Sequence, residues 1–288
     1  MIKTFSLLAN CKINIYLRIL GKRSDGYHDL DSLFYPLSHP ADHLDIAVHS
    51  GSGMTLRCCP RSLEKDGNIL HITYEAFAEM TGFRPGLKVF LRKGIPVGAG
   101  LGGGSSDAAA FLLFLNSMTR TKKLSQHKLL VLAAKIGADV PFFIFNRPAR
   151  IGGTGDKITA VNVNLKNLYI LVVCPDIPIS TAWAYQAWDE YGLYRKNTVP
   201  AFLTTEAKKD KGSTFDRLVL SNCFEQVVFP AFPQLGLLKL ELMQKGAAGC
   251  VLSGSGSSLS AFFRDKDTAM QACFTLDRQN IPFYYNKM

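Results

Sequence analysis

A glycine-rich run followed by small polar residues is the segment of this sequence best suited to chemistry. Residues 98–104 contain five glycines, and Ser105, Ser106 and Asp107 follow them. Serine and aspartate favour the start of a helix, and the alanines at 108–110 favour its continuation. A glycine loop that opens a helix presents unpaired N–H groups and the positive end of the helix dipole. The segment therefore predicts a phosphate-binding loop, with a tight turn that binds no ligand as the alternative.

The pattern of this loop excludes the commonest phosphate-binding motifs. No lysine precedes Ser105, so the Walker pattern is absent. Gly98, Gly100 and Gly103 satisfy G-x-G-x-x-G, which alone is weak evidence. About twenty residues further on, two lysines stand where a dinucleotide site needs an acidic residue. The H-R-D and D-F-G motifs that accompany a protein-kinase loop are also missing.

Two charged residues, Lys12 and Asp139, are ambiguous by pattern alone. Asp139 precedes Val140 and Pro141, a sequence typical of a helix N-cap. Lys12 stands beside an alternating strand pattern, where a lysine usually extends its ammonium group into solvent. A catalytic role for either residue therefore needs independent support.

The elements that position these residues are segregated strands and helices. The alternation over Ile13–Ile19 predicts a half-buried strand. Further strands are expected at 42–49, 86–92, 168–174, 259–263 and 283–285, and helices at 69–80, after the glycine loop, at 126–136 and at 267–279. This mixture predicts an α+β fold with a boundary near residues 150–163. The polar stretch Tyr194–Gly212 is expected to be a loop or a weakly packed insert.

Composition narrows the class of protein. The chain has 288 residues, 47% of them apolar, and a formal net charge of +10. These values indicate a folded globular protein with an affinity for anions. The seven cysteines are odd in number and form no C-x-x-C pair, so reduced thiols and a cytoplasmic location are expected. No apolar run is long enough for a membrane span, and the histidine and cysteine spacings predict no metal site in the protein.

Five stretches, taken in order along the chain, resemble the GHMP kinases, the family of galactokinase and of homoserine, mevalonate and phosphomevalonate kinases. Residues 96–109 resemble its ATP-binding loop, residues 9–17 its N-terminal motif and residues 252–258 its C-terminal motif. Residues 21–28 and 136–143 resemble the branch whose acceptor is a cytidine-diphosphate-linked sugar alcohol. The resemblance covers nearly the whole chain.

The resemblance implies a two-domain α+β fold. An N-terminal, ribosomal-S5-domain-2-like domain that binds ATP is expected at residues 1–155. A C-terminal, ferredoxin-like α/β domain is expected at residues 156–288, with the active site in the cleft between the two.

The same resemblance implies the catalytic groups. Asp139 is expected to be the general base that takes the proton of the acceptor hydroxyl, and Lys12 to orient that carboxylate and stabilise charge on the transferred group.

The donor site implied by the resemblance is the glycine loop with two flanking residues. The residues assigned to ATP are Pro96, Val97, Gly98, Ala99, Gly100, Leu101, Gly102, Gly103, Gly104, Ser105, Ser106, Asn68 and Lys93. The amides of residues 100–106 are expected to hold the phosphates. Lys93 is expected to neutralise phosphate charge, with an ordinary surface lysine as the alternative. Asn68 is expected to contact adenine, with a helix cap as the alternative.

The acceptor site is expected to recognise a pyrimidine. Tyr27 offers an aromatic face, and His28 offers hydrogen-bonding ring nitrogens. Tyr185 is expected to supply a second aromatic face, with buried packing as the alternative. Asn14 and Thr181 are candidates for the sugar-alcohol or phosphate end, beside Asp139.

The expected ligands are ATP with Mg²⁺ and a cytidine-diphosphate-linked methylerythritol, and the chain is expected to be a monomer or a homodimer. Nucleic acid is not expected, because the basic cluster at 208–211 is interrupted by an acid and lacks neighbouring aromatic residues. The alternatives are a GHMP kinase with a mevalonate- or homoserine-type acceptor, a non-catalytic nucleotide-binding protein, and a dinucleotide-dependent oxidoreductase. The Tyr27-His28 pair argues against a mevalonate- or homoserine-type acceptor. The presence of both Lys12 and Asp139 argues against a non-catalytic protein, and the missing acidic residue argues against an oxidoreductase.

Overall fold

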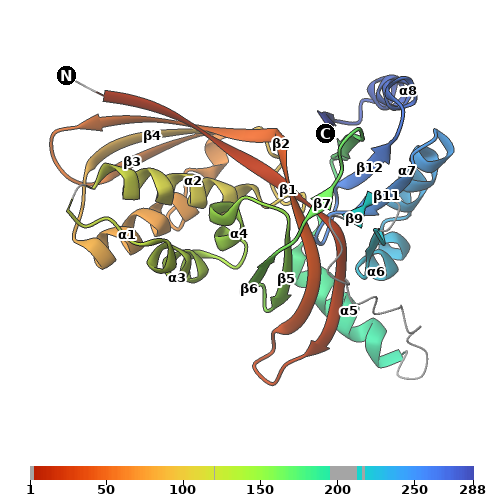
Figure 1. The fold of residues 1–288 in the computed structure, drawn as a ribbon, viewed down its shortest axis with the longest axis horizontal. Coiled ribbons are helices and arrows are strands. Elements are labelled where there is room, and N and C mark those ends of the chain that lie inside the picture. The colour runs from red at the N-terminus through yellow and green to blue at the C-terminus, as the bar shows by residue number, and fades with distance from the viewer. Residues whose placement is uncertain (1–2, 120, 195–212, 216–217) are drawn as a thin grey trace.

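A computed structural model describes residues 3–119, 121–194, 213–215 and 218–288 of the chain (Figure 1). Its first sheet is built around a long antiparallel hairpin of β1 (Lys3–Lys22) and β2 (His28–His49). β4 (Gly86–Arg92) pairs with β2, and β3 (Met54–Cys59) forms the edge beside β4. β5 (Ala149–Gly153) pairs with β2 and with β6 (Lys157–Ala160), while β10 (Ser221–Asn222) joins β1 from the C-terminal half.

Four helices cover one face of this sheet, as Figure 1 shows. They are α1 (Ile69–Thr81), α2 (Gly103–Met118), α3 (Gln126–Ile136) and α4 (Val140–Phe145), and the short 3₁₀ helix η1 (Arg61–Leu63) precedes them. Phe77, Phe111 and Phe142 are almost completely buried in the core between the helices and the sheet. Burial of each such side chain contributes about 1.5–3 kcal/mol, so this core fixes α2 against β1 and β2.

The second sheet has the antiparallel order β11-β12-β8-β13. Its strands are β8 (Tyr169–Val173), β11 (Gly249–Leu252), β12 (Leu259–Phe263) and β13 (Phe283–Lys287). The accompanying helices are α5 (Thr181–Tyr194), α6 (Glu225–Ala231), α7 (Pro233–Gln244) and α8 (Lys266–Arg278). Along the chain, the strands of this sheet and its helices follow the order β8, α5 to α7, β11, β12, α8 and β13. With the strand order of the sheet, this is the ferredoxin-like arrangement, in which α5 to α7 take the place of the first helix. The α+β expectation for both halves is confirmed.

A separate cluster of buried side chains joins the two sheets. Ile13 and Ile15 of β1 are fully buried against Ile170 and Val172 of β8 and their neighbours. Lys12 and Asn14, on the alternate face of β1, are also buried. The prediction of a half-buried strand over Ile13–Ile19 is therefore wrong for its first half, because this part of β1 is covered on both faces.

The predicted strands and helices are found, with shifted ends. The two N-terminal strands are much longer than the expected 13–19 and 42–49, because the paired strands continue through both halves of the molecule (Figure 1). The helices α5, α6 and α7 were not assigned from the sequence, since they lack clear apolar periodicity and α6 contains Pro230. The stretch Tyr194–Gly212 is expected to be a loop or a weakly packed insert. All of it except Tyr194 lies outside the described residues, and so does the basic cluster at 208–211.

The boundary between residues 155 and 156 stays a prediction. β5 and β6 lie on opposite sides of it and form one hairpin in the first sheet. The two-residue strands β7 (Val163–Asn164) and β9 (Ser213–Thr214) pair with each other. None of the described helices combines the length and the apolar character needed to cross a lipid bilayer.

Candidate active site

The glycine loop leads directly into α2, as predicted. Gly102 is the N-cap in the left-handed conformation (φ 74°), and the helix begins at Gly103. The amide of Ser106 already donates to the carbonyl of Gly102 (2.9 Å). The first-turn amides without a partner inside the helix are therefore those of Gly103, Gly104 and Ser105, and these are the groups suited to an anion.

The loop is held between β1 and the turn formed by residues 253–258. The amide of Lys12 donates to the carbonyl of Leu101 (3.0 Å), and the Ser253 hydroxyl donates to the carbonyl of Gly100 (3.1 Å). At Ala99, the carbonyl accepts from the amide of Ser258 (3.3 Å). The glycine loop and the C-terminal turn are thus in direct contact, although they lie far apart in the sequence.

Close approach explains the glycine at position 100. Its φ is +76°, and an added Cβ would lie 2.0 Å from the carbonyl oxygen of Ser253. Such a contact cannot be relieved without moving backbone. Gly104 differs, because an added Cβ there would meet nothing within 4 Å, so its Cα faces open space at the start of α2.

Lys12 and Asp139 lie side by side next to this loop. The Lys12 ammonium is 3.9 Å from Asp139 Oδ2, and the lysine Cγ is 3.2 Å from where a Cβ on Gly102 would be. Lys12 is 3% exposed, and burial lowers the pKa of its ammonium group, while the Asp139 charge opposes that shift. The ammonium also lies 4.3 Å from the ring centroid of Phe34. The alternative of a solvent-exposed lysine is excluded.

Asp139 is at the N-cap position of α4, but its side chain makes no capping hydrogen bond. The carboxylate is about one-third exposed, 32%, and faces Lys12. Pro141 supplies the start of the helix, because a proline in the first turn needs no N–H partner. The carboxylate is therefore free for other chemistry while the backbone that carries it is fixed.

Asn14 connects this pair to the C-terminal half. Its Oδ1 accepts from the Lys12 ammonium (2.7 Å) and from the amide of Gly254 (2.9 Å). Its Nδ2 donates to the hydroxyl of Ser32 (2.9 Å). The Asn14 side chain is fully buried, and through these bonds it fixes Lys12 relative to the 253–258 turn. Ser32 was not anticipated from the sequence, and nothing in its immediate sequence marks it.

Two of the residues predicted for the acceptor, His28 and Tyr185, come together at the far end of the β1–β2 hairpin, beside α5 (Figure 1). The His28 ring stacks on Tyr185 with centroids 4.9 Å apart. His28 Nε2 is 2.6 Å from Asp189 Oδ1, and the other carboxylate oxygen of Asp189 accepts from Lys22 (2.6 Å). Tyr27 is 67% exposed and stands outside this contact.

Asp189 is a site residue that the sequence reasoning missed. It follows Tyr185 by four positions on α5, so both side chains lie on one face of the helix. The i, i+4 spacing was the available signal, but α5 itself was not recognised. Thr181, at the start of α5, shares a hydrogen bond with Ser255 (2.9 Å) and so lies next to the 253–258 turn.

Two residues assigned to ATP already have partners. Lys93 is buried and forms ion pairs with Asp42 and with Asp107 (2.8 Å). Its ammonium is thus beneath the loop with its charge shared between two carboxylates, and it is not the surface lysine of the alternative. Asn68 caps α1: Oδ1 accepts from Leu70 and Nδ2 donates to Leu63. Contact of either residue with the nucleotide stays a prediction.

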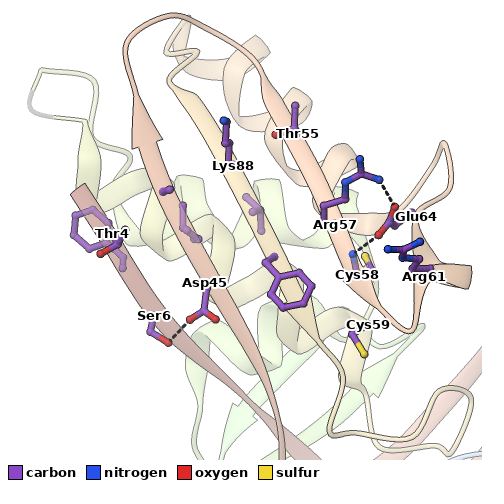
Figure 2. Close-up of a pocket in the computed structure, with 15 residues that line it drawn as sticks. Thr4, Ser6, Asp45, Thr55, Arg57, Cys58, Cys59, Arg61, Glu64 and Lys88 are labelled. Carbon is purple, nitrogen blue, oxygen red and sulfur yellow. Dashed lines mark hydrogen bonds and ion pairs between the residues drawn. The ribbon is translucent and has the colours of Figure 1, made fainter. Parts of the chain in front are cut away.

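A wide hollow of about 1410 Å³ lies elsewhere, on the sheet face opposite the helices (Figure 2). Its lining includes Thr4, Asp45, Arg57 and Lys88, and no residue predicted for the site. Within the described residues, no group of three or more histidine, cysteine or acidic side chains is arranged to hold a metal ion.

The fold and the site are those of a small-molecule kinase built on a glycine loop. The family models for the GHMP kinases N terminal domain and the GHMP kinases C terminal match residues 68–147 and 204–280. The chain belongs to the GHMP kinase family, whose members use ATP as phosphoryl donor.

Similar proteins narrow this class. The chain is 43% identical over 279 residues to 4-diphosphocytidyl-2-C-methyl-D-erythritol kinase of Nitratidesulfovibrio vulgaris, covering 97% of each chain. A crystal structure of 4-(cytidine 5'-diphospho)-2C-methyl-D-erythritol kinase matches with a TM-score of 0.77 at 30% identity, covering 98% of each chain. Homoserine kinase from Cytophaga hutchinsonii matches with a TM-score of 0.72 at 19% identity, over 99% of this chain and 95% of that one, which supports the fold alone.

Proposed function

We propose that the protein transfers the γ-phosphoryl group of ATP to the 2-hydroxyl of 4-(cytidine 5'-diphospho)-2-C-methyl-D-erythritol, a step of the non-mevalonate route to isoprenoid precursors. The observation that carries the proposal is the Lys12–Asp139 pair beside the amides of α2. The full-length similarity to kinases of that name supports the choice of acceptor.

Asp139 acts as the general base. Its carboxylate is partly exposed and makes no capping bond, so an acceptor hydroxyl can donate a hydrogen bond to it. As the hydroxyl oxygen attacks the γ-phosphorus, its proton passes to Asp139 and the bond from the γ-phosphorus to the bridging oxygen of ADP breaks. A positioned base contributes about 10²–10⁴ in rate, equivalent to about 3–5 kcal/mol.

Lys12 orients that carboxylate and offsets negative charge on the transferring group. At about 4 Å its attraction to an anion is ~1 kcal/mol in water and larger where water is excluded. The first-turn amides of Gly103, Gly104 and Ser105 hold the nucleotide phosphates, with Mg²⁺ arriving on them. This electrostatic positioning provides most of the catalysis in phosphoryl transfer.

The hairpin end beside α5 selects the acceptor. Tyr27, His28 and Tyr185 offer aromatic faces and a ring nitrogen to a cytosine, and Asp189 fixes the imidazole of His28. Thr181 and Asn14 both hydrogen-bond to the 253–258 turn, and they contact the sugar-alcohol or diphosphate part of the acceptor. A mevalonate- or homoserine-type acceptor has no base for the aromatic group to bind.

A cytoplasmic enzyme that acts on small molecules, as a monomer or a homodimer, fits these features. All seven cysteines are free, as a reducing compartment would leave them. The net charge of +10 suits two polyanionic substrates, because a positive protein raises the rate of encounter with them.

A coupled assay tests the proposal. Purified protein is supplied with MgATP and, in separate reactions, the cytidine-linked diol, mevalonate or homoserine, and ADP release is measured. Turnover is expected with the cytidine compound alone. Preference for either competitor would overturn the acceptor assignment, and MgATP binding without turnover of any acceptor would favour a non-catalytic nucleotide-binding protein.

A further inference from the structure

Three charged side chains from three elements form a buried cluster beneath the glycine loop. Lys93 follows β4, Asp42 lies in β2 and Asp107 lies near the start of α2. The Lys93 ammonium donates to Asp42 Oδ2 and to Asp107 Oδ2 (2.8 Å). The side chains are 8%, 0% and 2% exposed, so solvent does not screen these charges.

The cluster holds both ends of the loop. On the side where the chain enters it, Asp42 Oδ1 accepts from the amides of Gly94 (2.7 Å) and Ile95 (2.8 Å). On the exit side, Asp107 is part of α2, and the Lys93 ammonium is 3.1 Å from where a Cβ on Gly103 would be. The charges therefore lie directly against the backbone whose amides face the phosphates.

The charges of the cluster do not balance. Two carboxylates and one ammonium leave a net charge of −1 when all three groups are ionised. Asp107 Oδ1 is buried and has no hydrogen-bond partner among the described residues. Burial raises the pKa of Asp107 to about 8; the charge of Lys93 opposes this shift, and that of Asp42 adds to it.

We propose that Asp42, Lys93 and Asp107 position the glycine loop for ATP, and that Asp107 takes up a proton when the nucleotide phosphates bind there. A buried negative charge against the loop repels the polyphosphate, and a proton on Asp107 leaves the cluster neutral. The proton comes from solvent and no bond of the nucleotide changes. The proposal rests on the ATP half of the proposed function and is independent of the acceptor.

Other titratable groups near the loop must be separated from Asp107. Lys93, Asp42 and Cys58 face Asp107, and burial raises the pKa of the Cys58 thiol, so it stays protonated. The attraction of Asp107 and Asp42 outweighs burial and raises the pKa of Lys93, so it stays charged. Lys12 is different, because burial lowers the pKa of its ammonium group, and its contribution must therefore be separated from that of Asp107.

The experiment is calorimetric titration of the protein with MgATP at pH 8.0 in two buffers of different ionisation enthalpy, which gives the protons taken up on binding. Wild type is expected to take up about half a proton more than Asp107→Asn, because a group with a free pKa near 8 is half protonated at that pH. Over pH 7.0 to 9.0 the Kd of wild type is expected to rise about tenfold, and that of Asp107→Asn much less.

Positioning by Asp42 is tested by a matched pair of variants. Asp42→Ala removes the acceptor of the Gly94 and Ile95 amides and is expected to raise the Kd for MgATP about tenfold or more at every pH, because a charged hydrogen-bond acceptor is lost. Asp42→Asn keeps an oxygen acceptor and is expected to recover most of the affinity. Equal affinity of wild type and Asp42→Ala would overturn the positioning role.

Two controls complete the design. Asp265→Ala removes the cap of α8, far from the loop, and is expected to destabilise the fold while leaving proton uptake unchanged. Lys12→Met keeps Asp107 and is expected to retain the half-proton uptake. If Asp107→Asn does not fold, Lys12→Met decides alone: absence of uptake in it overturns the proposal. Equal proton uptake by wild type and Asp107→Asn would also overturn the proposal.

Discussion

The carboxylate of Asp139 lies 3.9 Å from the ammonium of Lys12 and makes no hydrogen bond to the helix that it precedes. A side chain that capped the start of α4 would contribute to the stability of the helix. The Asp139 carboxylate instead leaves its helix uncapped and faces a buried cation, so it is suited to exchanging a proton with a ligand. This relationship separates the chemical role of Asp139 from its structural position.

Asp139→Asn is expected to reduce turnover by about 100- to 10,000-fold, because the amide cannot accept the hydroxyl proton. The urea midpoint of unfolding and the Kd for MgATP should stay close to wild type, since no capping bond is lost. Steady-state kinetics, urea titration and calorimetry measure the three quantities. A variant with wild-type turnover would show that Asp139 has no catalytic part.

Asn14→Ala is expected to lower both stability and turnover. It leaves Lys12 and the amide of Gly254 without their buried acceptor, which costs about 1–3 kcal/mol in free energy of unfolding. The matched control is Asn116→Ala, which removes a buried asparagine that bonds Leu124. The control should lose similar stability and keep its kcat; a parallel loss of kcat in both would indicate a purely structural role for Asn14.

Asp189→Asn is expected to raise KM for the cytidine acceptor several-fold and leave KM for ATP unchanged. The charged partner of His28 Nε2 is replaced by a neutral amide, so the imidazole loses its fixed orientation. Lys22→Met is the control, because Lys22 contacts the other oxygen of the same carboxylate. It should leave both constants near wild type, and an equal effect of the two variants would assign the result to general disturbance of α5.

Gly104→Ala and Gly100→Ala are expected to have opposite effects on the stability of the fold. At Gly104 a methyl group meets no protein atom, so helix stability rises by up to about 1 kcal/mol while the phosphate approach is obstructed and the Kd for MgATP rises. At Gly100 the methyl collides with the Ser253 carbonyl, and the fold is destabilised. Urea unfolding and calorimetry distinguish the two. Unchanged MgATP affinity in Gly104→Ala would place the phosphates elsewhere.

The sequence by itself determined the parts whose signals are local. Glycine spacing followed by Ser-Ser-Asp and alanines specifies a loop that opens a helix. Apolar periodicity places the ends of α1, α3 and α8 to within one residue. The five motifs, in their order along the chain, identify the family without any structural information. These features depend on backbone propensity and short-range spacing, which every residue carries with it.

Only the tertiary structure decided which polar residues act together. Folding turned Lys12 from an apparent surface lysine into a buried cation, because the glycine loop, Phe34 and Asn14 all contact its side chain. Folding likewise gave Lys93 two carboxylate partners and brought Asp189 to His28. Such pairings join residues from distant parts of the chain, and a linear pattern does not contain the packing that creates them.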